Sequence, residues 1–128
     1  MKKHIPSIAR ILLGLMFTAS FIAGMMGKIP PPKGESALAF MTTLADSGLL
    51  SFIKVIELVC GLALLSGFFV PLALLVLAPI IVVITFYHLL LDPSGMAVGF
   101  VMTALWLTAG SAYRTIFLSL LHAKQPAN

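Results

Sequence analysis

The chain has 128 residues, of which 60% are hydrophobic and only 9% are charged, whereas soluble domains carry roughly 25% charged residues. This composition predicts a single-domain integral membrane protein and excludes an ordinary soluble enzyme. The net charge of +4 comes from scattered basic residues, so no basic stripe exists and we expect no nucleic-acid partner. The single cysteine, Cys60, excludes an intramolecular disulfide and a CxxC redox pair, and we interpret it as a small core residue.

Four apolar segments are long enough to cross a bilayer, for which roughly 20 residues are needed. They cover about residues 8–27, 49–69, 72–91 and 96–112. The first follows a basic start, but three more apolar segments come after it, which favours an uncleaved span over a signal peptide. Because only helices or closed barrels satisfy the backbone in lipid, we predict an all-α, antiparallel four-helix bundle in the membrane. Pro79 is expected to kink the third span.

The connection after the first span has two parts. Residues 28–33 read KIPPPK, and consecutive prolines hold such a stretch extended. The segment at about residues 36–46 has apolar side chains at helical spacing, with Ser36 as a candidate N-cap. It is too short to span the membrane, so we predict a short interfacial helix in the first outer loop.

The distribution of basic residues predicts the orientation of the bundle. With the N-terminus inside, the inner surface holds Lys2, Lys3, Arg10, Arg114 and Lys124, and the outer surface holds only Lys28 and Lys33. The positive-inside rule therefore places both termini in the cytoplasm and the proline loop outside.

Two ionisable residues, Lys54 and Glu57, lie inside the second span. Each costs roughly 2.5–3.5 kcal/mol on insertion scales, and such residues are functional candidates by default. They are three residues apart and share one helix face. Gly61 continues this face and allows another backbone to come close. Two interpretations stay open, a structural ion pair and a ligand or proton site.

The topology brings other polar residues to the same outer half. His88 lies about one turn below the outer surface, with Thr85 three residues before it and Asp92 four residues after it, and such residues share a helix face. We predict a small polar pocket beneath the short helix, lined by Lys54, Glu57, Thr85 and His88. A dry, packed ion-pair cluster is the alternative. Supporting residues are Lys28 and Asp92 on the outer side and Arg10 and Arg114 on the inner side.

The chemistry of this pocket would be hydrogen bonding and proton exchange. His88 is the candidate for proton exchange, because imidazole ordinarily titrates near neutral pH; the alternative is an interfacial, hydrogen-bonded histidine. No metal is expected, because one histidine and scattered carboxylates provide no ligand spacing. Catalytic residues are not identifiable.

Several motifs occur in a specific order along the chain. The first span, ARILLGLMFTASFIAG, contains Arg10, Gly14 and Phe17 in an R-x-x-x-G-x-x-F pattern. A core segment, IKVIELVCGLALLSGFFVPLALLVLAPIIV, is followed by FYHLLLDPSG and then by AYRTIF. With this order and spacing, the chain resembles the DoxX, or DoxD-like, family of small four-span bacterial membrane proteins. The resemblance implies a multi-pass protein of the bacterial inner membrane.

The resemblance also implies a function. The name-giving members of the family are similar to a membrane subunit of a thiosulfate:quinone oxidoreductase. Other members are linked to thiol-redox complexes. The chain has neither a haem CxxCH motif nor a dinucleotide glycine fingerprint, so we expect no intrinsic cofactor. The resemblance therefore favours a membrane subunit of a respiratory or thiol-redox complex that contacts quinone. A peripheral oxidoreductase subunit would be its partner and would deliver the electrons.

Two other functions stay open. One is a small-molecule transporter or carrier that uses Glu57, although small multidrug transporters place their glutamate in the first span. The other is a membrane scaffold without a site of its own. Whether the chain is an enzyme and whether it forms a homo-oligomer are also open.

Overall fold

The apolar segments form long helices in a computed structural model that describes residues 2–127. Within these residues, four stretches are long and apolar enough to cross a membrane. Three are single helices: α1 (Ile5–Met25), α3 (Leu49–Ser66) and α4 (Val70–Leu90). The fourth, Pro93–Ser119, consists of the 3₁₀ turn η1 (Pro93–Gly95), α5 (Met96–Gly110), the 3₁₀ turn η2 (Ser111–Tyr113) and α6 (Arg114–Ser119). The short helix α2 (Glu35–Asp46) connects α1 to α3.

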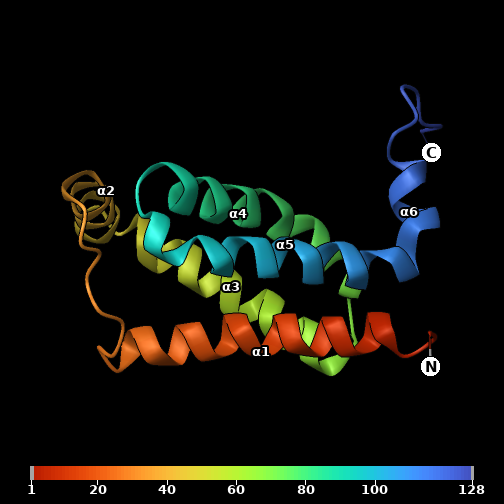
Figure 1. The fold of residues 1–128 in the computed structure, drawn as a ribbon. Coiled ribbons are helices and arrows are strands. Elements are labelled where there is room, and N and C mark those ends of the chain that lie inside the picture. Colours follow the sequence, from red (N-terminus) through yellow and green to blue (C-terminus); the bar gives the residue numbers. More distant parts are fainter. Residues whose placement is uncertain (1, 128) are drawn as a thin grey trace.

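The long helices form one antiparallel bundle. Helix α1 packs against α3 and α5, and α4 packs against the same two helices. Each helix therefore has antiparallel neighbours on both sides. Helix α2 lies across one end of the bundle, and both termini lie at the other (Figure 1). This arrangement confirms the prediction of an all-α membrane bundle with a short helix between its first two spans. We call the two ends the α2 end and the terminal end.

The turn between α3 and α4 differs from its predicted position. The second span was predicted to reach residue 69, but α3 ends at Ser66 because Gly67 has a φ of 84°. A left-handed glycine at this position is a common end of a helix. The predicted spans left Val70 and Pro71 between them as the turn, but these two residues begin α4, since proline suits a first helical turn. Helix α2 likewise begins at Glu35 after Gly34, so Ser36 lies inside the helix rather than at its N-cap.

Large apolar side chains fill the centre of the bundle. Leu13, Phe17, Leu64, Leu74 and Leu77 are almost completely buried. Pro79 lies inside α4 and has no N–H, so the carbonyl four residues earlier loses its partner. The adjacent carbonyl, that of Leu74, accepts a 2.7 Å hydrogen bond from the indole of Trp106 on α5. The indole thus stabilises α4 from outside, next to the interruption.

Two glycines determine how closely α1 and α3 cross. A Cβ atom on Gly61 would lie 2.9 Å from Thr18 Oγ1 and 3.2 Å from the Gly14 carbonyl oxygen. A Cβ atom on Gly14 would lie 2.9 Å from the Gly61 carbonyl oxygen. Side chains at these positions would push the backbones apart. Small residues allow close packing of this kind between membrane helices.

Replacing Gly61 with alanine should therefore destabilise the bundle. Overpacking of a tight contact costs about 1–3 kcal/mol, which denaturant titration of the protein in mixed micelles can measure. Gly24→Ala in α1 is the matched control, because a Cβ atom there would be 3.7 Å from its nearest neighbour. Equal stability of the Gly61→Ala and Gly24→Ala variants would contradict the close crossing.

Candidate ligand-binding cavity

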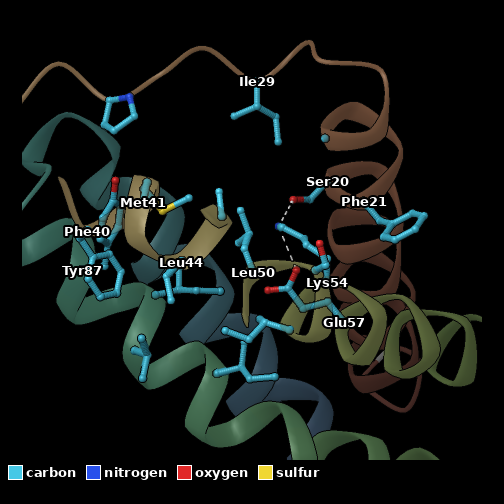
Figure 2. Close-up of a pocket in the computed structure, with 18 of the residues that line it drawn as sticks. Ser20, Phe21, Ile29, Phe40, Met41, Leu44, Leu50, Lys54, Glu57 and Tyr87 are labelled. Carbon is cyan, nitrogen blue, oxygen red and sulfur yellow. Dashed lines mark hydrogen bonds and ion pairs between the residues drawn. The ribbon is translucent and has the colours of Figure 1, made fainter. Parts of the chain in front are cut away.

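A cavity of about 1020 Å³ lies in the α2 half of the bundle (Figure 2). Residues of all four long helices, one face of α2 and the proline loop line it. We call it the α2 cavity. Its lining is mainly apolar, with a small number of polar side chains. Cavities of this size and composition are typical of small-molecule sites.

The main polar group of the α2 cavity joins α3 to α1. The Lys54 Nζ atom donates a 3.1 Å hydrogen bond to Ser20 Oγ on α1 and lies 2.9 Å from Glu57 Oε2. All three residues line the cavity, and Figure 2 shows both interactions as dashed lines. The predicted pair of Lys54 and Glu57 thus exists, and a serine of the first span completes it.

Ser20 was missed by the sequence analysis. A serine in a helix usually hydrogen-bonds to a carbonyl in the preceding turn of the same helix. A serine in an apolar span therefore does not by itself indicate a polar site. Its depth in the first span, similar to that of Lys54 in the second, was the only available signal.

Glu57 is the buried charge of this group, with 3% of its surface exposed. Its Oε2 atom is close enough to Lys54 for an ion pair, but it has no hydrogen-bond partner of good geometry within residues 2–127. A buried carboxylate oxygen without such a partner is costly. It therefore retains acceptor capacity at the wall of the cavity.

A second polar region lies on α4. The side chains of Tyr87 and His88 also line the cavity, and their rings are 5.0 Å apart between centroids. The Tyr87 ring packs against Phe40 of α2 at 5.6 Å, which connects α2 to the bundle. His88 Nδ1 lies 3.3 Å from the backbone carbonyl of Asp92, so a proton on Nδ1 can be donated to that oxygen. Tyr87 was not foreseen, because an aromatic residue near a span end ordinarily reads as an interfacial anchor.

Thr85 requires a correction, because it does not line the α2 cavity. Its hydroxyl donates to the Ile81 carbonyl at 2.8 Å and lies 3.3 Å from Thr103 Oγ1 on α5. A Cβ atom on Gly99 of α5 would be only 2.8 Å from the Thr85 Cα atom. Thr85 therefore belongs to the contact between α4 and α5.

The four supporting residues also lie outside the cavity lining. Lys28 is exposed after α1, and Arg114 is exposed at the start of α6. The Asp92 carboxylate accepts a 2.6 Å hydrogen bond from Ser94. Arg10 donates to the Leu64 carbonyl near the end of α3, where a cation is favourable beside the last carbonyls of a helix. Arg10 thus stabilises the end of α3, and Asp92 holds the turn before α5.

The polar side chains at the cavity are an ammonium–carboxylate pair, the hydroxyls of Ser20, Thr42 and Ser51, a phenol and an imidazole. These groups can donate and accept hydrogen bonds and exchange protons. No group of three or more His, Cys, Asp or Glu residues within residues 2–127 could hold a metal ion.

Removing the charge of Lys54 should destabilise the protein through Glu57. In Lys54→Met the carboxylate loses its counter-charge in a buried position, which typically costs about 3–5 kcal/mol. The double variant Lys54→Met/Glu57→Gln should recover much of this loss in the same micellar unfolding assay. Lys33→Met, at an exposed position, is the control. A double variant less stable than the Lys54→Met single variant would contradict the coupling of the pair.

Comparison with known proteins identifies the chain. No curated protein and no solved structure matches it. The sequence model of the DoxX family matches residues 5–90, which include α1 to α4 with Ser20, Lys54, Glu57 and His88. This match covers well over half of the 128 residues, and the chain is therefore a multi-span membrane protein of the DoxX family.

Proposed function

We propose that this protein is a membrane subunit of a respiratory or thiol-redox complex and that its α2 cavity binds a quinone or a similar neutral amphipathic molecule. The observation that carries the proposal is the combination of a large, mainly apolar cavity with the buried polar group Lys54–Ser20–Glu57 inside a membrane bundle. An apolar cavity with a few polar groups is suited to an apolar ring that bears polar oxygens.

The charge of the cavity favours a neutral ligand. Lys54 and Glu57 together carry no net charge when both are ionised, and they are already paired at 2.9 Å. A cationic substrate would have to displace Lys54 from Glu57 and leave the ammonium without a partner, at considerable cost. This argues against a transporter that binds cations at Glu57.

The residues would have simple roles in binding. The Lys54 ammonium would donate a hydrogen bond to a carbonyl oxygen of the ligand, and Glu57 would accept one from a reduced, hydroxyl form. His88, on α4, would exchange protons with the ligand. A peripheral oxidoreductase subunit would deliver the electrons.

A photoreactive azido-quinone should label the protein in proteoliposomes at residues of the α2 cavity, identified by peptide mass spectrometry. The quinol form should compete with this labelling, and Glu57→Gln removes the charged acceptor for its hydroxyl. Loss of a charge-assisted hydrogen bond of about 1.5–3 kcal/mol corresponds to at least tenfold weaker competition by the quinol. Glu35→Gln is the matched control, because Glu35 is exposed on α2 and does not line the cavity.

Quinol competition that Glu57→Gln does not change, or labelling confined to the terminal end, would contradict the proposal. Proton-coupled uptake that disappears in Glu57→Gln would instead support the transporter. A protein that neither binds quinone nor transports would be a scaffold.

We also propose that the terminal end faces the cytoplasm in the bacterial inner membrane. All four acidic residues, Glu35, Asp46, Glu57 and Asp92, are in the α2 half of the chain's fold, whereas five of the eight Lys and Arg residues are in the terminal half. This asymmetry agrees with the positive-inside rule.

Cysteine labelling tests this orientation. In a Cys60→Ser background, Lys33→Cys should react with a membrane-impermeant maleimide added to intact spheroplasts. Lys124→Cys should react only after permeabilisation. The reverse pattern would overturn the orientation without affecting the bundle itself.

A further inference from the structure

A second hollow lies on the surface of α3 and α4. It has a volume of about 520 Å³, and we call it the α3–α4 groove. On α3 it is lined at intervals of four residues by Val55, Val59 and Ala63, which places them along one face. Its lining on α4 includes the small Ala73. Every residue that lines the groove is apolar.

The groove adjoins the α2 cavity. Val55 lines both. On α4, Val76 lines the groove and Val83 lines the cavity, and residues seven apart lie on the same face of a helix. Val55 and Val83 are 53% and 57% exposed, so the cavity reaches the surface of the bundle between α3 and α4, where the groove begins.

We propose that the α3–α4 groove holds the apolar chain of the molecule whose headgroup occupies the α2 cavity. The inference rests on the proposed function and narrows the ligand class to amphiphiles with a long, single apolar chain, such as an isoprenoid quinone. The polar group needed for the headgroup is in the cavity, and only apolar side chains follow along the groove. Because the two hollows adjoin at Val55, one ligand could extend from the cavity into the groove.

The direction and length of the groove fit such a chain. From Val55 to Ala63 the groove follows α3 for eight residues, roughly 12 Å at 1.5 Å per residue. Helix α3 runs from the α2 end to the terminal end (Figure 1), so the residues that line the groove lead from the level of Lys54 toward the terminal end. A chain in the groove would thus lie along the bundle while its headgroup stays at Lys54. Specificity would come from close packing against the groove, because lipid chains are as apolar as its lining.

Filling the groove should weaken binding of the apolar chain and leave binding of the headgroup unchanged. In Ala63→Phe the ring would occupy the groove without reaching the polar group of the cavity. Binding of a long-chain isoprenoid quinone, measured by competition with the azido-quinone in detergent, should weaken about tenfold. Binding of a headgroup analogue with a methyl group in place of the chain should change by less than about twofold. In the wild-type protein the long-chain quinone should bind more tightly than the analogue.

Ala104→Phe is the matched control, because Ala104 is exposed on α5 and lines neither the cavity nor the groove. Val59→Trp, at a 60% exposed position on the groove, replaces Ala63→Phe if the latter does not fold. Equal effects on the long and short ligands, or equal wild-type affinities, would overturn the groove inference while the cavity site stands. If the wild-type protein binds neither ligand, the proposed function fails, and this inference fails with it.

Discussion

The close crossing of α1 and α3 at Gly14 and Gly61 determines where the polar residues can meet. At the crossing the backbones are too close for even a methyl group. Seven residues toward the α2 end, roughly 10 Å along the axis, the link between these helices is the long Lys54 side chain on Ser20. The α2 cavity lies on this side of the crossing, where a long side chain rather than a backbone contact joins the two helices.

The Lys54–Glu57 ion pair adds little to the stability of the fold, because burying its charges costs free energy. Removing two charges from water is expensive, and apolar residues of similar volume are often as stable or more so. Ser20 offsets part of the cost for Lys54, but Glu57 Oε2 has no hydrogen-bond donor of good geometry among the described residues. A buried acceptor at the wall of a large cavity is easier to understand as part of a binding site than as a stabilising contact. The apolar interior and the glycine contact already hold the bundle together.

The architecture could be predicted from the sequence, because the length and polarity of each span depend only on its own residues. The pair at Lys54 and Glu57 was predictable for the same reason, since its spacing lies within one helix. Contacts between helices were harder to predict from the sequence. Spacing places Thr85 and His88 on one face of α4, but only packing decides that Thr85 meets Thr103 on α5 while His88 borders the cavity. The turn at Gly67 was misplaced because a left-handed glycine and a nearby proline each predict a turn, and here the glycine ends one helix and the proline starts the next.

The hydrogen bond from Arg10 to the Leu64 carbonyl has a consequence for how the molecule moves. It fixes α1 to the end of α3 on one side of the glycine crossing, whereas on the other side the flexible Lys54 side chain makes the hydrogen bond between the same helices, beside the α2 cavity. Regions with few packed contacts fluctuate most. We therefore expect the two ends of the bundle to fluctuate unequally. The terminal end should be rigid, whereas the helices at the α2 end should move apart and together about the glycine crossing. A ligand of variable shape could be accommodated by such motion without any rearrangement of the core.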